Sequence, residues 1–386
     1  LEITLKDELI GTELILSYTI YEAFPAVCRN ACFRQTGEET GVLDEAMSLS
    51  LDLPDRDYDL VTLTGAWARE RYVRTEHLRE GAQEVYSMRG HSSHQFNPFL
   101  ALKRPNADEK QGEVLDFSLV YSGNFLGKVN VDTYGVTRVL LGIHPEGFSW
   151  TLKPGESFQT PEAVMVYSSE GLNGMSQTFH KLYRTRLCRG SWRDKVRPVL
   201  INNWEATFMN FTEEKILNIA RTAADLGVEL MVLDDGWFGK RDSDTSSLGD
   251  YSVNAKKLPN GLKGLGKKLN AMGLQFGLWF EPESVSPDSE LYRRHPDWAL
   301  HDSLGRTDLL GRHQLLLDLT KPEVRDHIVE SVGGILDSAP ISYVKWDMNR
   351  HSCALGAKQH EFILGLYDVL RRIFEPRPEI LLESCS

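Results

Sequence analysis

Cysteine is scarce in this chain, and its positions do not suggest crosslinks. The 386 residues contain five cysteines: Cys28, Cys32, Cys188, Cys353 and Cys385. Because the number is odd and the spacing scattered, the sequence predicts neither a disulfide framework nor a CxxC motif. Reduced thiols are typical of the cytoplasm, which is the location we expect. No signal peptide is visible, although the chain begins at Leu1 instead of methionine and its true start is expected upstream.

Long hydrophobic runs and a basic charge excess are also missing. No run of about 18 apolar residues occurs, so no membrane-spanning helix is predicted. Lys and Arg number 43 against 55 Asp and Glu, a net charge of -12. Without a basic excess to neutralise phosphates, nucleic acid is not an expected partner. No glycine-rich loop follows a predicted strand, which argues against a dinucleotide-binding fold.

Short runs rich in β-branched and aromatic residues fill the first part of the chain. Residues 14–21, 114–121 and 137–143 are examples, and turn signals such as Lys153-Pro154-Gly155 separate them. Many short strands at this spacing are typical of packed antiparallel sheets. The sequence therefore predicts an amino-terminal β-sandwich domain over residues 1–180, followed by a linker over 181–196.

The sequence pattern changes from residue 197 onward, where predicted apolar strands alternate with predicted helices. Strands are expected at 199–205, 229–237, 274–283, in a run ending at Asp347, and at 379–386. This alternation predicts a parallel sheet, and the polar residues at each carboxyl end favour a (β/α)8 TIM barrel over 197–386. Residues 315–319 are either a sixth barrel strand or a short loop strand. Because a closed barrel has eight strands, we expect this barrel to be incomplete and the chain to be a fragment.

Carboxylates and tryptophans recur at the predicted strand ends. They are Trp204, Glu205, Asp234, Asp235, Trp237, Trp279, Glu281, Glu283, Lys345, Asp347, Asn349, Glu383 and Cys385. In a barrel these ends converge on one face. Tryptophan faces stack on sugar rings, and carboxylates accept hydrogen bonds from sugar hydroxyls. A carboxylate can also attack an anomeric carbon, so the pattern predicts a sugar site.

Three other interpretations of the strand ends stay open. Acidic strand ends also bind Mg²⁺ or Mn²⁺, which would make the protein a metal-dependent barrel enzyme. Lys345, two residues from Asp347, argues against a cation there, and no HExxH motif occurs. The same residues would also serve as helix caps and internal ion pairs. A non-catalytic sugar-binding protein is a third class.

Several long motifs resemble glycoside hydrolase family 36. They are Asn202-Asn203-Trp204-Glu205, Asp234-Asp235-Gly236-Trp237-Phe238-Gly239, Gly277-Leu278-Trp279-Phe280-Glu281-Pro282-Glu283, Tyr343-Val344-Lys345-Trp346-Asp347-Met348-Asn349-Arg350 and Glu383-Ser384-Cys385-Ser386. The resemblance is to bacterial α-galactosidases of the raffinose- and melibiose-hydrolysing type, and it covers essentially the whole chain. It implies an antiparallel β-supersandwich followed by the catalytic barrel, and a tetrameric assembly.

The resemblance also implies an activity and roles for individual residues. The reaction would be retaining hydrolysis of terminal α-1,6-linked galactose, with a galactoside as substrate and without a metal or cofactor. Asp347 matches the nucleophile, and Asp234 and Asp235 match the pair that holds the 4- and 6-hydroxyls. The remaining matches in the sugar pocket are Trp204, Trp279, Arg312, Lys345, Asn349 and Cys385. A galactosyltransferase or an α-N-acetylgalactosaminidase of the same family is the alternative.

The sequence departs from the family pattern at a few points. His313 replaces the usual Asn after Arg312, and Ser284 replaces the usual Met after Glu283. Neither change removes a charge that the mechanism needs. The acid/base Asp of the family is expected beyond Ser386. We therefore expect the 386 residues alone to be inactive.

Overall fold

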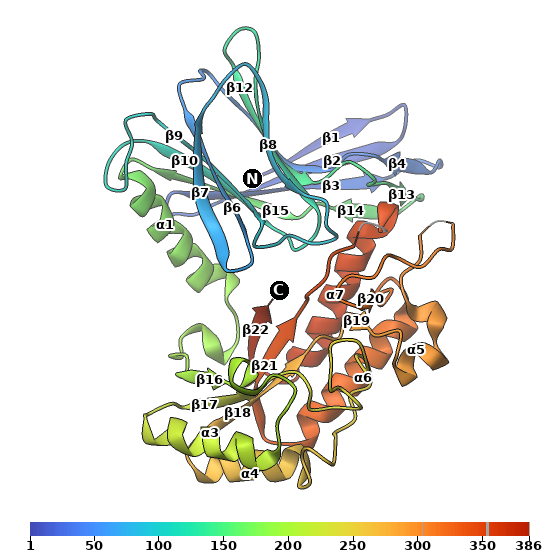
Figure 1. Cartoon of the computed structure of the whole chain (residues 1–386). Coiled ribbons are helices and arrows are strands. Elements are labelled where there is room, and N and C mark those ends of the chain that lie inside the picture. The colour runs from blue at the N-terminus through green and yellow to red at the C-terminus, as the bar shows by residue number, and fades with distance from the viewer. Residues whose placement is uncertain (303, 353–354, 386) are drawn as a thin grey trace. The chain divides into compact units, whose positions relative to one another are not determined.

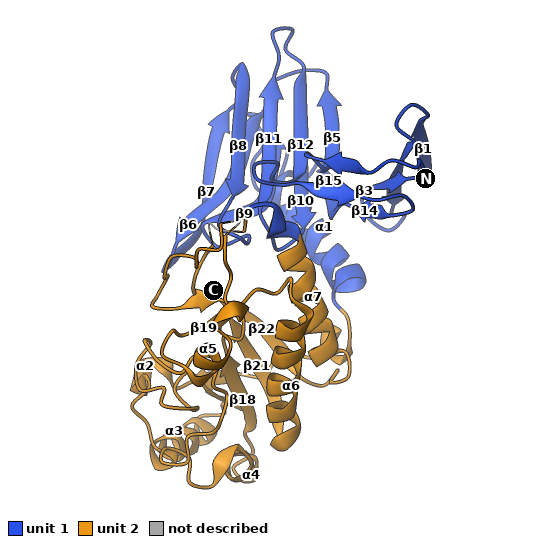
Figure 2. Cartoon of the chain, turned by 90° about the vertical axis from the view of Figure 1, so that its right-hand side faces the viewer, with its two compact units in different colours: residues 1–188, 356–360 blue, residues 189–355, 361–386 orange. Residues whose placement is uncertain are grey.

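The computed structural model describes residues 1–302, 304–352 and 355–385. The chain forms two compact units, which Figure 2 colours separately. The first contains Leu1–Cys188 and Gly356–His360, and the second contains Arg189–Leu355 and Glu361–Ser386. The segment 181–196, predicted as a linker, holds the end of helix α1 (Gly171–Leu182), a π-helical turn and a 3-10 turn. No described helix is both long and apolar enough to cross a membrane.

The first unit is built on a nine-stranded antiparallel sheet (Figure 1). Its order is β1-β2-β3-β15-β10-β9-β6-β7, with β14 paired to β3. The strands are β1 (Glu2–Asp7), β2 (Thr12–Ile20), β3 (Ala26–Gln35), β6 (Asp59–Ala66), β7 (Arg69–His77), β9 (Phe96–Lys103), β10 (Val114–Val120), β14 (Ser157–Gln159) and β15 (Glu162–Ser168). The β-branched and aromatic runs of the sequence therefore form strands as predicted.

A four-stranded antiparallel sheet packs on one face of the larger sheet. Its strands, in the order β5-β12-β11-β8, are β5 (Met47–Leu53), β12 (Thr137–Ile143), β11 (Phe125–Val131) and β8 (Gly81–Ser87). The two sheets approach closely, because a Cβ on Gly127 would lie 2.8 Å from Cδ2 of Leu100 in the larger sheet. A short ladder joins β4 (Gly41–Leu43) to β13 (Trp150–Leu152). The predicted antiparallel β-sandwich is confirmed.

Helix α1 forms a hydrophobic core with strands of the larger sheet. Met175, Phe179 and Leu182 of this helix are buried with strand residues that include Val166 and Ala101. Asp116 of β10 pairs with both of these strand residues, so its side chain points into the same layer. It is fully buried, and neither carboxylate oxygen has a hydrogen-bond partner among the described residues. Burial raises the pKa of Asp116 well above its usual value.

The second unit contains a five-stranded parallel sheet flanked by helices. The strand order is β16 (Leu200–Asn202), β17 (Leu230–Leu233), β18 (Gln275–Phe280), β21 (Ile341–Asp347) and β22 (Leu381–Cys385). The main connecting helices are α3 (Glu213–Asp225), α4 (Gly261–Ala271), α6 (Pro322–Ser338) and α7 (Gln359–Phe374). Strand and helix alternate as in part of a (β/α)8 barrel, which confirms the predicted fold class.

The ambiguous segment 315–319 lies outside this sheet. Its strand β20 (Leu315–Leu316) pairs antiparallel with β19 (Ser284–Val285), so it belongs to a loop and the described barrel strands number five. A short helix, α5 (Glu290–Arg294), lies between them in sequence. The predicted strand 199–205 is wrong at its end, because Trp204 and Glu205 lie in the short helix α2 (Trp204–Thr207). Helix α3 is capped at its start by Thr212, whose Oγ1 accepts from the Lys215 amide at 3.3 Å.

Candidate active site

The parallel order brings the carboxyl ends of the five strands to one edge of the sheet. Trp279 is paired with Lys345 in the next strand, and Asp347 is paired with Cys385. Asp234 and Asp235 follow directly after β17. The residues that the sequence predicted as a site are therefore gathered by strand register.

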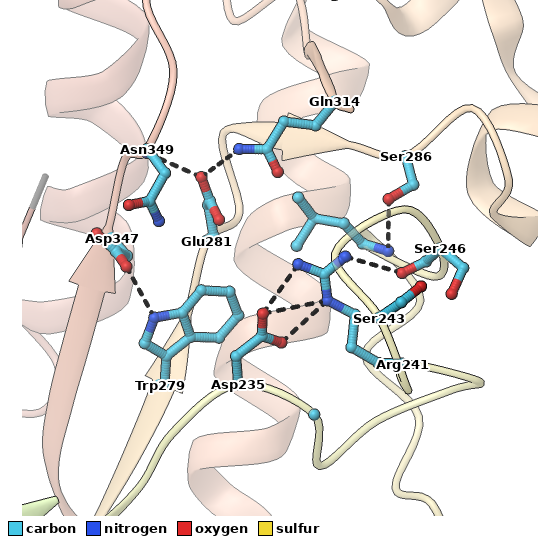
Figure 3. Close-up of polar contacts among 12 residues, drawn as sticks. Asp235, Arg241, Ser243, Ser246, Trp279, Glu281, Ser286, Gln314, Asp347 and Asn349 are labelled. Carbon is cyan, nitrogen blue, oxygen red and sulfur yellow. Dashed lines mark hydrogen bonds and ion pairs between the residues drawn. The ribbon is translucent and has the colours of Figure 1, made fainter. Parts of the chain in front are cut away.

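Asp347 is buried at the end of β21 with its carboxylate held in place. Its Oδ2 accepts a hydrogen bond from the Trp279 indole Nε1 at 3.0 Å (Figure 3). Its Oδ1 accepts from the Met348 amide at 3.1 Å. That amide also donates to the Cys385 carbonyl, which ties the ends of β21 and β22 together. Burial, and then the charge of Asp347, raise the pKa of the Cys385 thiol to about 12, so this side chain is protonated at neutral pH.

Asp234 links three strands through its carboxylate. Its Oδ2 accepts from Lys345 Nζ at 2.9 Å and from Asn202 Nδ2 at 2.5 Å. Its Oδ1 accepts from the Asp235 amide at 2.9 Å. Burial lowers the pKa of Lys345, but the Asp234 carboxylate outweighs burial and the net shift is upward. Lys345 therefore stays protonated and gives the site one fixed cation.

Asp235 is paired with Arg241, a residue that sequence reasoning missed. The guanidinium donates from Nε to Oδ1 at 3.0 Å and from Nη2 to Oδ2 at 2.9 Å (Figure 3). The side chains are 7% and 2% exposed, so the ion pair is buried. Burial raises the pKa of Asp235 and Arg241 opposes it, leaving a net upward shift. The available signal was a basic pair, Lys240-Arg241, in the loop after β17, which no strand-end pattern selects.

Two buried glutamates follow β18. Glu281 Oε1 accepts from Gln314 Nε2 at 2.6 Å and from the Asn349 amide at 2.8 Å (Figure 3). Glu283 accepts from Trp346 Nε1 at 2.9 Å. Burial raises the pKa of both to about 7, and only for Glu281 does the charge of Asp347 add to the rise.

Two of the predicted site residues, Trp204 and Arg312, are not fully buried. Trp204 is partly exposed in α2, where its ring meets Phe208 edge-on at a centroid distance of 5.2 Å. Arg312 is exposed, and both Arg312 and His313 adopt left-handed backbone conformations, with φ of 51° and 61°. No hydrogen bond or ion pair joins Arg312 to another predicted site residue among the described contacts. The described contacts therefore do not fix the Arg312 side chain against the carboxylates of the site.

A metal centre was the rival interpretation of these carboxylates. Within the described ranges, no group of three or more His, Cys, Asp or Glu side chains is arranged to hold a metal ion. Asp234 is instead paired with an ammonium group and Asp235 with a guanidinium group. The chemistry that the arrangement offers is a fixed, buried carboxylate beside hydrogen-bonding groups and indole rings.

Comparison with known proteins adds an independent line of evidence. The Melibiase family model matches residues 157–386, and the model of the glycosyl hydrolase family 36 N-terminal domain matches residues 1–153. Alpha-galactosidase AgaA of Geobacillus stearothermophilus is 58% identical, and the match covers 100% of this chain and 54% of AgaA. Alpha-galactosidase Mel36A of Lactobacillus acidophilus is 45% identical, with 100% of this chain and 54% of Mel36A covered.

Solved structures give the same result. The crystal structure of AgaA has a TM-score of 0.98 at 57% identity, and the match covers 100% of this chain and 55% of that chain. An alpha-galactosidase structure from Lactobacillus brevis has a TM-score of 0.96 at 43% identity, covering 100% and 53%. The chain spans about half the length of the curated relatives it matches. The chain belongs to glycoside hydrolase family 36.

Proposed function

We propose that the protein containing this chain is a retaining α-galactosidase. It would release terminal α-1,6-linked galactose from melibiose and raffinose-family sugars through a galactosyl-enzyme on Asp347. The observation that carries this proposal is the buried Asp347 carboxylate at the end of β21, held by the Trp279 indole. The relatives named above are alpha-galactosidases, and variants of AgaA have been crystallised with raffinose and with stachyose.

The proposed mechanism assigns a task to each part of the site. Asp347 would attack the anomeric carbon, and the hydrogen bonds to its two oxygens fix its direction of approach. Asp234 and Asp235 would accept hydrogen bonds from the 4- and 6-hydroxyls. We assign the other sugar contacts to Trp204, Trp279, Arg312, Lys345, Asn349 and Cys385.

A retaining hydrolase also needs a proton donor, with its carboxyl group about 5–5.5 Å from the nucleophile. Glu281 and Glu283 are buried and already accept hydrogen bonds from protein groups. We therefore assign neither of them to proton donation. The donor is proposed to be a carboxylate outside the 386 residues.

The test is a reaction of the whole protein with an aryl α-galactoside in the presence of EDTA. NMR should show α-galactose as the first product, and Asp347→Ala should abolish its release. Added azide should restore turnover of this variant and give β-galactosyl azide, because azide then takes the place of the missing carboxylate. β-Galactose as first product, or full activity of Asp347→Ala, would overturn the proposal. Loss of wild-type activity with EDTA would favour the metal-dependent alternative.

Two further proposals concern the assembly and the cellular location. We propose a homotetramer on the basis of the family resemblance, to be tested by light scattering coupled to size exclusion. We propose the cytoplasm as location, and the free thiols of Cys28, Cys32, Cys188 and Cys385 support a reducing compartment. Fractionation of cells that express the whole protein tests this directly.

A further inference from the structure

Glu281 joins two loops that approach Asp347 from different parts of the chain. It is the first residue after β18 and is 2% exposed. One donor to its Oε1 is the Asn349 amide, two residues beyond Asp347. The other is the Gln314 side chain, two residues beyond Arg312. One buried oxygen thus restrains both loops.

A second bridge connects the same two loops. Arg350 Nη1 donates to the Gln314 carbonyl at 3.1 Å, and Arg350 is itself 5% exposed. The loop that carries Gln314 contains the left-handed residues Arg312 and His313, a strained conformation that needs restraint from its surroundings. Glu281 and Arg350 supply that restraint through their hydrogen bonds to Gln314.

We propose that Glu281 is a positioning residue, whose buried carboxylate holds the Asn349 and Arg312 loops in register around Asp347. This inference rests on the proposed function and adds a residue that touches no substrate. Burial and the charge of Asp347 raise the pKa of Glu281 to about 7. The two carboxyl groups therefore interact electrostatically. As pH rises through 7, Glu281 ionises and becomes a stronger acceptor for both donors.

Glu283 provides a matched control within the same Glu-Pro-Glu sequence. It is also buried and its pKa is also raised to about 7, but its carboxylate accepts from Trp346, and no described hydrogen bond joins that carboxylate to Asn349 or Gln314. Replacing either glutamate removes a buried carboxyl group at nearly the same place. Only the change at Glu281 should displace the Asn349 and Arg312 loops.

The test compares Glu281→Gln, Glu281→Ala and Glu283→Ala in the whole protein. Glu281→Ala should raise KM for an aryl α-galactoside by about tenfold or more, because two buried donors lose their acceptor. Glu281→Gln keeps an acceptor oxygen at the same reach and should restore KM to within about threefold. In the wild type, galactose binding measured by calorimetry should tighten between pH 6 and 8, and Glu281→Gln should reduce this dependence more than Glu283→Ala does, since the pKa of Glu283 is also raised to about 7. Glu283→Ala should leave KM within about threefold.

Crystal structures of the same variants provide a readout that needs no activity. Asn349 and Gln314 should move in Glu281→Ala and stay in place in Glu281→Gln and Glu283→Ala. Unmoved loops in Glu281→Ala, or equal kinetic effects of Glu281→Ala and Glu283→Ala, would overturn the inference. A wild-type protein that does not hydrolyse the α-galactoside would overturn the proposed function, while the loop positions would still decide the role of Glu281.

Discussion

The Trp279 indole is the side-chain donor that fixes Oδ2 of Asp347. Trp279→Phe keeps an aromatic ring in the pocket wall but removes this donor. We expect kcat to fall about 10- to 100-fold, because the attacking carboxylate is no longer held in one direction. Steady-state kinetics on an aryl α-galactoside measure this effect.

Trp346→Phe is the matched control for that substitution. It also removes an indole N–H from a buried carboxylate, but the carboxylate is Glu283. We expect lower thermal stability with kcat within about threefold of the wild type. Equal losses of kcat in both variants would contradict a specific role for the Trp279 hydrogen bond.

Arg241 compensates the buried charge of Asp235. Arg241→Met would leave that carboxylate unpaired at a site where both side chains are almost fully buried. We expect the free energy of unfolding to drop by about 3–5 kcal/mol. Chemical denaturation at neutral pH measures this, and a drop below about 1 kcal/mol would show that Asp235 is solvated or protonated without its partner.

At the scale of single strands, Asp116 pairs with Val166 and Ala101 of an apolar layer, and its carboxylate has no hydrogen-bond partner in the part of the chain that the structure describes. Its raised pKa means that the folded state keeps a proton that the unfolded state has already lost. The contribution of Asp116 to stability is therefore most favourable below the unfolded pKa near 4 and becomes less favourable as pH rises above it. Asp116→Asn cannot ionise, so we expect it to flatten this decline.

Denaturation of the wild type and Asp116→Asn between pH 5 and 8 checks the expected slope. Asp52→Asn is a suitable control, because Asp52 lies on β5 and Arg138 lowers its pKa. Asp52 is ionised in both states across this range, so its replacement should not change the slope. Parallel pH profiles of wild type and Asp116→Asn would contradict the assignment of a buried neutral acid.

The elements themselves were largely predictable, and the exceptions have physical reasons. The alternation of apolar strands with helices predicted the parallel sheet. The strand ends predicted that residues such as Lys345 and Asp234 lie on one face, and the structure adds the ion pair between them. The segment 315–319 stayed ambiguous because a two-residue strand has no hydrophobic period. Arg241 and the double contact of Glu281 were not predicted, since they depend on loop conformations that sequence periodicity does not encode.

For the molecule as a whole, the segment Gly356–His360 belongs to the first unit although its neighbours in sequence belong to the second. The Tyr121 hydroxyl lies 3.0 Å from His360 Nδ1, and Asn124 Nδ2 donates to Gln359 Oε1 at 2.7 Å. Burial lowers the pKa of His360 to about 4. This segment is therefore an integral part of the core of the first unit.

His360 should make the protein sensitive to acid. The unfolded state takes up a proton near pH 6.5 and the folded state only near 4, so stability falls as pH drops through this interval. We expect His360→Gln to reduce the difference in melting temperature between pH 7 and pH 5. An unchanged difference would mean that other groups dominate acid unfolding.

The placement of Gly356–His360 also sets an order of events during synthesis. A ribosome that has completed residue 188 has made every strand of the first unit, yet Asn124 still lacks Gln359 and Tyr121 still lacks His360. These partners emerge only after β16, β17, β18 and β21 have been translated. Amino-terminal domains usually fold first as a protein is made. The β-sandwich of this chain, however, can reach its final packing only when most strands of the parallel sheet have left the ribosome.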